Sequence, residues 1–507
     1  MNLNGCALET TCVAWQFINW EKVTQSVKSV QSRIVKAIKE GRHNKVKSLQ
    51  WLLTHSFSAK LLAVKRVTQN AGKKTAGTDG IIWKNPRQKM NAAKSLRRNG
   101  YKARPLKRVY ILKKNGNKRP LGIPTMHDRA MQALYLMALV PVAETKADPC
   151  SYGFRIGRNC ADAIARCYIH LSRTDSPTWV LEGDIKGCFD HINHQWLLDN
   201  IPIDKLVLQQ WLKSGFIEGG RLFPSTEGTP QGGIISPTLA NMTLDGLEYA
   251  INRSYREKIR GMGIVGRNRH KIHLIRYADD FIVTADSPDI LQEVIQPAIE
   301  KFLSDRGLAL SAEKTKISNI EKGFDFLGQN IRKYKGKLFI KPSNSSYTSI
   351  TSKVKEIIKM SYSIKPAKLI VMLNPVIRGW CNYHKHVVSK KTFNKLDNYI
   401  FKLLWHWAKR NHQNKPRQWV VDKYFNAIIG SKWMFSGLLD NKYRVTLFRA
   451  WHTPITRHVL IKGKANPFDP DWDSYFTNRA RKRVTVYSGH TDPPFRPYRP
   501  PSFEGAF

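Results

Sequence analysis

Two adjacent carboxylates between two apolar runs constrain this chain most, in the stretch HLIRYADDFIV at residues 273–283. Apolar, β-branched residues on both sides predict two strands joined by a tight hairpin turn, with Asp279 and Asp280 at the turn. A third acid, Asp184, ends another short apolar run, TWVLEGDI. If these strands are neighbours in one sheet, the three carboxylates converge at one point. The alternative is that the Asp pair is only a polar hairpin turn.

Converging carboxylates repel one another, and burial strengthens the repulsion, so such a group needs a cation. Mg²⁺ prefers oxygen ligands and keeps open positions for substrate phosphates. Two such ions about 4 Å apart are the usual device for in-line phosphoryl or nucleotidyl transfer. We therefore predict that Asp184, Asp279 and Asp280 are catalytic residues and the ligands of two Mg²⁺ ions.

The rest of the chain is strongly basic, with 84 Lys and Arg against 38 Asp and Glu and a formal net charge of +46. Such a chain repels itself unless it binds something negative, and a nucleic-acid backbone is the obvious partner. A membrane surface is the rival, but no apolar run suggests a spanning helix and the N-terminus is not a secretory signal, so we expect no membrane partner. The seven Cys include no CxxC pair, which argues against a Cys-rich zinc site and favours a reducing compartment.

The 507 residues predict three or four domains. Helical spacing runs from about residue 20 to 63, and an acid-free basic stretch from 80 to 127 contains a strand–turn–strand pattern. Three amphipathic helices are expected between residues 347 and 412. The segment beyond residue 424 is mixed, basic and aromatic, and the Pro-rich end is expected to be extended or disordered.

The order of the motifs resembles reverse transcriptases. YADD resembles their Tyr-x-Asp-Asp box, DIKGCFD at 184–190 their first metal-binding motif, and GTPQGGIISPTLANMTLDGLE at 228–248 their template- and nucleotide-positioning motif. In this form the set is similar to the proteins encoded by group II introns. LNPVIRGWCNYH resembles their thumb, or maturase domain, and residues 452–479 resemble their DNA-binding region.

The resemblance implies an α+β multidomain protein with right-hand reverse transcriptase fingers and palm, an α-helical thumb and a small C-terminal DNA-binding region. The expected parts are an N-terminal helical extension with the first reverse transcriptase block (1–85), fingers and palm (86–340), thumb/maturase domain (341–425), DNA-binding region (426–490) and Pro-rich tail (491–507). Many relatives end in an HNH nuclease with paired Cys and His. The chain stops soon after YFTNR without such a pair, so we expect no endonuclease.

Basic residues at the strand–turn–strand pattern are candidates for binding the incoming nucleotide. Lys113 and Arg119 flank the NGN turn, where a hairpin would aim both at a triphosphate. The alternative is general backbone binding by a basic hairpin. Lys314, in AEKTK, is a candidate general acid for the leaving pyrophosphate, or else a solvated lysine at a helix end.

Two further candidates rest mainly on the resemblance. Phe189 lies where reverse transcriptases place a bulky side chain under the sugar, which implies selection against a ribose 2′-hydroxyl; the alternative is a core Phe. Gln231 with Gly232 would let the backbone approach the template base and nucleotide closely.

Basic residues along the chain are the candidates for nucleic-acid contact. Aromatic residues among the thumb helices could stack on bases or belong to the core. The predicted nucleic-acid-binding residues are Arg108, Arg155, Arg158, Gly232, Arg378, Lys385, Lys409, Arg410 and Arg457.

The resemblance implies an RNA-directed DNA polymerase that is also a maturase. It would bind its group II intron RNA, assist splicing and reverse splicing into target DNA, and copy the intron with dNTPs for retrohoming, in the bacterial cytoplasm. Priming would come from an existing DNA 3′ end. Two alternatives stay open: an RNA-binding splicing factor with a vestigial polymerase, and a reverse transcriptase recruited to phage defence.

Overall fold

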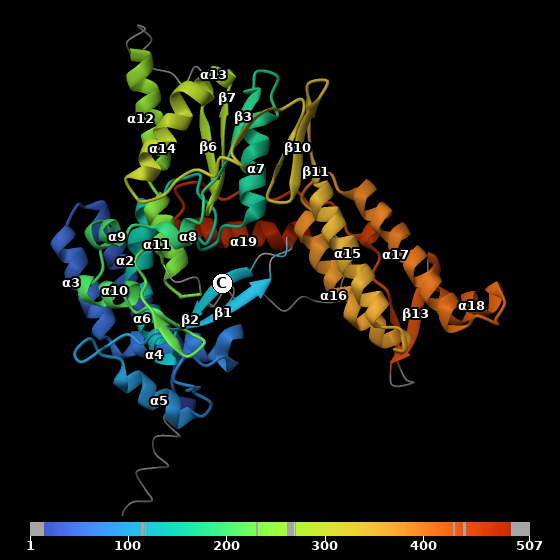
Figure 1. Cartoon of the computed structure of the whole chain (residues 1–507), viewed down its shortest axis with the longest axis horizontal. Coiled ribbons are helices and arrows are strands. Elements are labelled where there is room, and N and C mark those ends of the chain that lie inside the picture. The colour runs from blue at the N-terminus through green and yellow to red at the C-terminus, as the bar shows by residue number, and fades with distance from the viewer. Residues whose placement is uncertain are drawn as a thin grey trace, which may run out of the picture.

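The computed structural model describes residues 15–112, 116, 118–229, 232–260, 268, 270–428, 431–439 and 443–487. Lys113, Gln231 and the Pro-rich tail therefore lie outside the described residues. Figure 1 shows helices and a small sheet at one end, a second sheet with helices at the other, and a separate group of helices to the side. Within the described residues, no helix is both long enough and apolar enough to cross a membrane.

The N-terminal layer is helical, as the spacing predicts. Its centre is α6 (Met126–Lys146), which is buried on nearly every side because its sequence is apolar all round. Gln31 reaches this helix from α2 and donates to the carbonyl of Met137 at 2.8 Å. The helices that surround or adjoin α6 are α2 (Trp20–Lys39), α3 (His43–His55), α4 (Phe57–Gln69), η1 (Ala71–Lys74) and α5 (Pro86–Ser95).

The predicted strand–turn–strand pattern forms a hairpin. Strands β1 (Leu106–Leu112) and β2 (Lys118–Ile123) pair antiparallel. β4 (Phe216–Glu218) joins the other edge of β1, and β5 (Arg221–Phe223) pairs with β4, so the order of this finger sheet is β2-β1-β4-β5. Most of β1 is exposed, which leaves a basic strand facing solvent. The connecting helices are α8 (Cys188–His191), α9 (His194–Asn200) and α10 (Lys205–Leu212).

The second sheet contains all three candidate acids. Its order is β6-β7-β3-β8, and every neighbouring pair is antiparallel. Successive side chains of a strand point to opposite faces, and both faces of this sheet are buried. Val180 and Ile282 face a core that includes α7. Leu181 and Val283 face the core shared with the N-terminal helices. The strands are β3 (Trp179–Asp184), β6 (His273–Tyr277), β7 (Asp280–Ala285) and β8 (Lys316–Asn319); the covering helices are α7 (Cys160–Leu171), α11 (Ser236–Leu244), α12 (Leu247–Arg260), α13 (Pro288–Ile290), η2 (Leu291–Ile295) and α14 (Gln296–Ser304).

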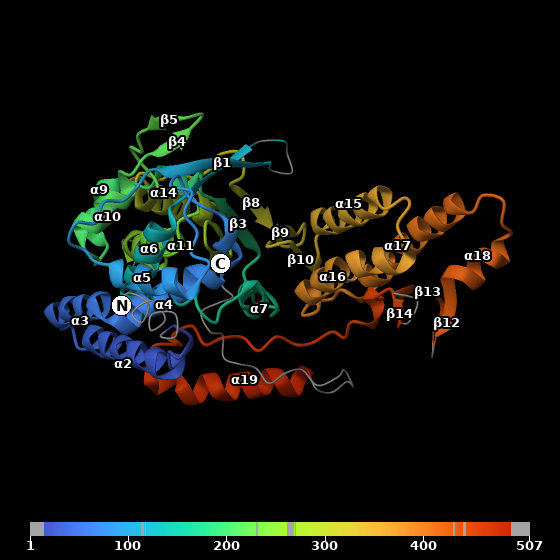
Figure 2. The same ribbon diagram turned by 90° about the horizontal axis from the view of Figure 1, so that it is seen from below.

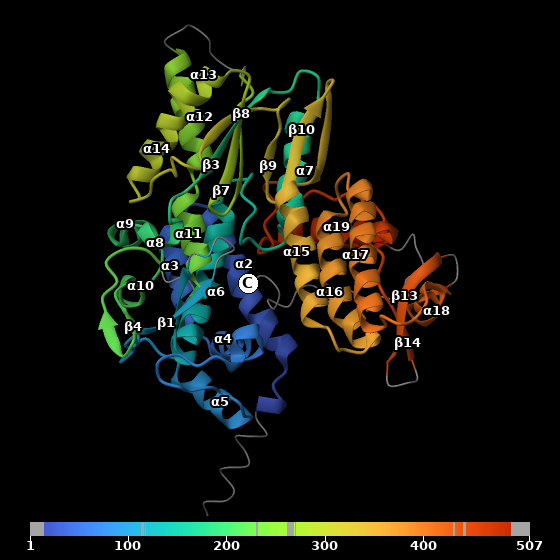
Figure 3. The same cartoon turned by 45° about the vertical axis from the view of Figure 1, so that its right-hand side comes forward.

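A three-stranded sheet connects this palm to the thumb. Strands β9 (Phe324–Phe326), β10 (Gln329–Tyr334) and β11 (Lys337–Pro342) form a meander. Three helices follow, as predicted for residues 347–412, and they pack around a core of their own. They stand beside the palm in Figure 3. Their bounds are α15 (Asn344–Met360), α16 (Pro366–His384) and α17 (Lys390–Asn411), with the short α18 (Arg417–Tyr424) after them.

The C-terminal part of the chain takes two paths. Strands β12 (Phe425–Ile428), β13 (Ser431–Leu439) and β14 (Tyr443–Thr446) form a sheet that shares the thumb core. Beyond the turn η3 (Ala450–His452) an extended segment runs back beneath the palm to η4 (Pro470–Trp472) and α19 (Asp473–Tyr487), as Figure 2 shows. Lys39 of α2 pairs with Asp469 of this segment at 2.6 Å.

Candidate active site

The palm sheet brings the acids together. Asp184 ends β3, and it lies directly opposite Asp280, the first residue of β7, in the antiparallel register. Asp280 also pairs with Tyr277 of β6, so only Ala278 and Asp279 form the turn. Ala278 has a φ of 57°, the left-handed conformation that a two-residue hairpin turn of this kind requires. The prediction that these strands are neighbours in one sheet is confirmed.

A glycine admits the aromatic ring that packs beside Asp184. Gly183 precedes Asp184 and lies opposite Phe281. A Cβ at Gly183 would lie 2.2 Å from the Phe281 ring. The space under the strand end is therefore filled by Phe281, and any side chain at position 183 would displace it.

A buried arginine supports the turn from the other side. Arg276 of β6 is fully buried, forms an ion pair with Asp245, and donates to the side-chain oxygen of Asn241 at 3.2 Å and to the carbonyl of Ala278 at 3.4 Å. The amide of Asn241 in turn donates to the carbonyl of Gly153 at 2.7 Å.

The loop that contains Gly153 packs tightly on the turn. A Cβ at Gly153 would lie 2.3 Å from the backbone nitrogen of Ala278. The loop is aligned by Ser151, which forms a parallel bridge with Arg276. The Ala278–Asp279 turn is therefore fixed by a backbone contact on one side and by the Arg276 network on the other.

Lys314 lies at the carboxylates. Its ammonium nitrogen is 2.9 Å from Oδ2 of Asp184, and this hydrogen bond raises the pKa of Lys314. The backbone nitrogen of Ser311 donates to the carbonyl of Asp184 at 2.8 Å, which holds the loop of Lys314 against the end of β3.

The environment of the turn makes ionisation of its two acids less favourable. Burial raises the pKa of Asp279, and the charge of Asp184 adds to the effect. Burial and the repulsion of Asp279 and Asp184 raise the pKa of Asp280 to about 6. The charges of Arg119 and Lys314 lower the pKa of Asp279, so a finger-sheet cation acts on the palm carboxylates.

This donor set fits a divalent cation. Two carboxylates with raised pKa and a third on the facing strand are hard oxygen ligands that added positive charge would stabilise. In the described part of the chain, however, no group of three or more His, Cys, Asp or Glu side chains is arranged to hold a metal ion. Asp184 and Asp280 lie on neighbouring strands and Asp279 lies in the turn, and the Lys314 ammonium forms an ion pair with Asp184.

Two predicted nucleotide-binding residues border this end of the palm. Phe189 lies in α8, half-buried, with its ring packed edge-on against Phe154 at 6.3 Å. Gly232 has a φ of 115°, and a Cβ there would lie 2.8 Å from the carbonyl of Gly122 in β2. The loop therefore approaches the finger hairpin by backbone alone, which requires glycine.

Two of the predicted nucleic-acid-binding arginines are structural, and these predictions are wrong. Arg155 is buried, pairs with Glu144 at 2.9 Å and donates to backbone carbonyls. Arg158 is buried and donates to the carbonyls of Pro149 at 3.0 Å and Gly463 at 2.7 Å. The loop sequence around Arg155 and Arg158 does not reveal the buried carboxylate and carbonyl groups to which they donate.

The other predicted residues lie at least partly on the surface. Arg378, Lys409, Arg410 and Arg457 are exposed, whereas Arg108 and Lys385 are half-buried. Arg108 lies 3.6 Å above the Phe216 ring, and burial lowers the pKa of Lys385. The thumb aromatics are divided: Trp407 is core, whereas Trp380 is half-buried and donates to Ser346 at 3.1 Å.

Sequence reasoning missed the supporting residues, above all Arg276 and Asp245. One signal was available, because Arg276 interrupts the apolar run HLIRY at a position that must point into the core. A buried arginine demands an acidic partner, but that partner lies 31 residues away, and the sequence does not identify it.

Three family models match the chain. Residues 111–331 match "Reverse transcriptase (RNA-dependent DNA polymerase)", residues 15–96 match "N-terminal domain of reverse transcriptase", and residues 347–425 match "Group II intron, maturase-specific domain". These three segments coincide with the N-terminal helices, the fingers and palm, and the thumb.

Curated relatives agree with these matches. The chain is 32% identical to protein YkfC of Escherichia coli over 260 residues, which are 46% of this chain and 68% of the relative. It is 28% identical to the group II intron-encoded protein LtrA of Lactococcus lactis over 391 residues, 61% of this chain and 64% of the relative. It is 27% identical to maturase-like protein 1 of Euglena gracilis over 386 residues, 73% of this chain and 78% of the relative. The chain thus spans about two thirds of the first two.

Proposed function

This chain belongs to the reverse transcriptases encoded by group II introns, and from that membership we propose that its palm synthesises DNA on an RNA template. The observation that carries the proposal is the cross-strand pairing of Asp184 with Asp280, beside Asp279 at the turn. β3 ends and β7 begins at the same edge of the palm, so substrate would reach three carboxylates at once.

Two Mg²⁺ ions are the cofactor that we propose, and they would supply Lewis-acid activation of the primer hydroxyl and charge neutralisation at the transferring phosphorus. The protein's part is to hold the carboxylates. Arg276 and the Gly153 loop fix the turn that presents Asp279, and the β3–β7 pairing fixes Asp184 relative to Asp280.

Cations from the fingers and palm would hold the incoming dNTP. Arg119 on β2 would meet the triphosphate, because its charge already acts on Asp279. Lys113, outside the described residues, would assist it. Lys314 would release Asp184 and give a proton to the leaving pyrophosphate.

Selection of the nucleotide would rest on backbone and ring contacts. Gly232 and its neighbour Gln231, which lies outside the described residues, would bring backbone against the base pair. Phe189 would exclude a ribose 2′-hydroxyl. The chain just before the loop of Gly232 contacts α8: the backbone nitrogen of Thr229 donates to the carbonyl of Phe189 at 2.7 Å.

The thumb would bind the intron RNA. Its helices match the maturase model and expose Arg378, Lys409 and Arg410. A cationic surface of this kind reduces the repulsion between packed RNA helices and favours a compact RNA. We propose that the protein so assists splicing and reverse splicing into target DNA in a bacterial cytoplasm, with Arg457 of the C-terminal segment among the contacts.

The test is extension of a DNA primer on an RNA template with Mg²⁺ and dNTPs. We compare the parent with Asp279→Ala, and use Asp289→Ala, an exposed acid of α13, as the matched control. Extension by the parent and the control, with loss in Asp279→Ala, supports the proposal. If no protein extends the primer while all three accelerate splicing of the intron, the palm is scaffold and the protein is a splicing factor.

A further inference from the structure

The hairpin of β10 and β11 has one face that the proposed polymerase does not use. Residues of β10 alternate strictly between buried and half-buried, and those of β11 nearly so. Ile331 and Ile340 point into the core shared with α7. The opposite face carries Arg332, Tyr334, Lys337, Phe339 and Lys341, which we call the ribbon surface.

The register brings these five side chains together. Arg332 lies directly opposite Phe339, and Tyr334 lies directly opposite Lys337. The Tyr334 ring lies at the centre: the Arg332 guanidinium is 4.5 Å from its centroid, the Lys341 ammonium is 5.1 Å away, and Phe339 meets it edge-on at 5.9 Å. Phe339 is 39% exposed, so its ring is accessible to a ligand.

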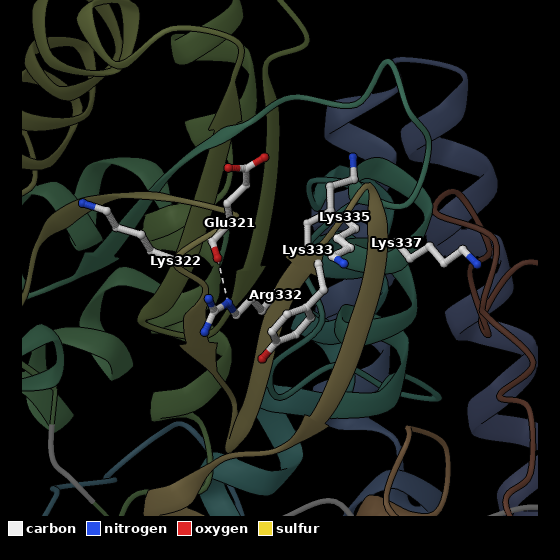
Figure 4. Close-up of a pocket in the computed structure, with 7 residues that line it drawn as sticks. Glu321, Lys322, Arg332, Lys333, Lys335 and Lys337 are labelled. Atoms are coloured by element: carbon white, nitrogen blue, oxygen red, sulfur yellow. Dashed lines mark hydrogen bonds between the residues drawn. The ribbon is translucent and has the colours of Figure 1, made fainter.

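The position of Arg332 is built into the fold. Its Nε donates to the carbonyl of Glu321 at 2.7 Å, as Figure 4 shows, and a Cβ at Gly323 would lie 2.8 Å from the Cβ of Arg332. Lys341 donates to the hydroxyl of Tyr334 at 3.1 Å. The cations are therefore held beside the aromatic rings. Lys322, Lys335 and Lys337 line a hollow beside the hairpin together with Arg332 and one acid, Glu321 (Figure 4).

The ribbon surface lies at the far end of the palm from the carboxylates. The backbone nitrogen of Lys333 donates to the carbonyl of Ile320 at 3.0 Å, and the neighbouring Asn319 pairs with Trp179 at the start of β3. Asp184 ends β3 five residues later, so the two places are about 17 Å apart along that strand. A ligand here would not be the substrate at the active site.

We propose that the ribbon surface binds an unpaired segment of RNA. Exposed aromatic rings stack on unpaired bases of any sequence, and flanking Arg and Lys meet the phosphates between them. A β-ribbon that alternates cations and rings on one face offers both contacts to one strand. The choice of RNA over DNA rests on the proposed function, because the chain's family is defined by its intron RNA. The position and the chemistry of the site are independent of the proposed function.

The test variant combines Lys337→Glu with Phe339→Ala, two exposed positions outside the catalytic machinery. The matched control combines Lys301→Glu with Tyr249→Ala, which removes an exposed lysine and an exposed aromatic ring from α14 and α12 with the same change of charge. Both full-length proteins are first shown to melt as the parent does. Binding of fluorescent oligouridine is then measured by anisotropy over a range of salt concentrations.

We expect the test variant to bind about tenfold more weakly than the control, because it loses one stacked base, and its salt slope to fall by about 0.7 for the lost phosphate contact. Photocrosslinking with 4-thiouridine should label the peptide of residues 329–342 in the parent. Equal weakening in test and control, or no label in that peptide, overturns the proposal, and tighter binding of oligodeoxyuridine than of oligouridine overturns the choice of RNA.

Primer extension separates this proposal from the function of the palm. At saturating template the test variant should extend a primer at the parental rate. A parent that extends no primer but shows the labelled peptide would refute the polymerase and leave the ribbon surface supported.

Discussion

The ammonium nitrogen of Lys314 lies 2.9 Å from the carboxylate of Asp184, at the end of the central strand β3. The lysine side chain is 67% exposed and the aspartate side chain only 21% exposed, so the cation reaches in from solvent to a fixed acid. A lysine held this way and a divalent ion would compete for the same oxygen. This relationship gives the first prediction.

Replacing Lys314 by Gln should have two separable effects. The Mg²⁺ concentration for half-maximal primer extension should fall, because no ammonium competes for Asp184. The rate at saturating Mg²⁺ should fall about 100-fold, because the general acid is lost. Lys316→Gln is the control. Lys316 on β8 forms an ion pair with Glu182 on β3 at 3.4 Å, but neither residue is among the three proposed metal ligands. An unchanged maximal rate would refute the role as an acid.

Gly183→Ala should destabilise the palm. The new Cβ would lie 2.2 Å from the Phe281 ring, so either the ring or the strand that ends at Asp184 must move. We expect a loss of about 1–3 kcal/mol in the free energy of unfolding, measured by thermal or denaturant melting. Gly379→Ala is the matched control: it lies inside α16 with nothing within 4 Å of its added Cβ. Gly379→Ala should leave the free energy of unfolding unchanged or raise it by about 1 kcal/mol. Equal effects of the two changes would contradict the packing argument.

Arg276→Met should cost about 3–5 kcal/mol, because it leaves Asp245, whose side chain is only 11% exposed, without its ion-pair partner. The double variant Arg276→Met with Asp245→Leu should recover much of the loss, because no buried charge is left unpaired. Denaturant melting of the parent, both single variants and the double variant gives the coupling energy. Additive losses would mean that the two side chains act independently.

The double variant should still be slow in primer extension, even where it is stable. Arg276 also donates to the carbonyl of Ala278, in the turn that contains Asp279, and methionine cannot replace that bond. Full activity in the double variant would show that the Gly153 loop alone positions the turn.

The sequence was enough to predict the parts of the fold that repeat a period. Short apolar, β-branched runs predicted β3, β6 and β7, and three- and four-residue spacing predicted α15 to α17. Because β3 ends and β7 begins at an acid beside an apolar run, the sequence suggested that the acids converge if the strands are neighbours; the register of Asp184 with Asp280 came only from the structure. These helices and strands can be predicted because each depends on the apolar pattern of residues close together in the sequence.

The missed features depend on contacts between distant segments. Arg155 and Arg158 read as surface cations because nothing in their loop reveals Glu144 or the carbonyl of Gly463, the latter 305 residues away. The path of residues 453–487 beneath the palm could not be foreseen either, since the contacts that fix it come from α2 and α7. A strand pattern also did not distinguish β12 to β14 from irregular chain.

Phe189→Val should relax the choice of sugar. If the ring excludes the 2′-hydroxyl, incorporation of ribonucleotides relative to deoxyribonucleotides should rise by on the order of 100-fold, measured as a ratio of kcat/KM values. Phe154→Leu is the control, because it removes the edge-on contact at 6.3 Å but keeps the Phe189 ring. An unchanged ratio in Phe189→Val, with lower stability, would identify Phe189 as a core residue.

The C-terminal segment should loosen from the palm in acid, because a buried carboxylate is one of the groups that hold it. Oδ1 of Asp162 in α7 accepts from the ring of His458 at 2.8 Å, from the backbone of Ile461 at 2.9 Å and from Arg479 at 2.9 Å. Burial opposes ionisation of Asp162, but the hydrogen bond from His458 and the charge of Arg479 outweigh it and lower its pKa. A lowered pKa means that the ionised carboxylate stabilises the docked state.

The sign of the pH dependence follows from that shift. The stabilisation is complete above the ordinary Asp pKa of about 3.9 and is lost as the pH falls through the lower value of the folded protein. The protection factors for hydrogen exchange of residues 453–487, which correct for the intrinsic pH dependence of exchange, should therefore be high at neutral pH and fall steeply only below about pH 4. Asp162→Asn should exchange rapidly even at neutral pH, since Arg479 loses its charged partner, whereas Asp473→Asn, an exposed acid on the same segment, should match the parent. Protection in Asp162→Asn equal to that of the parent at neutral pH would show that apolar contacts, not this carboxylate, hold the segment in place.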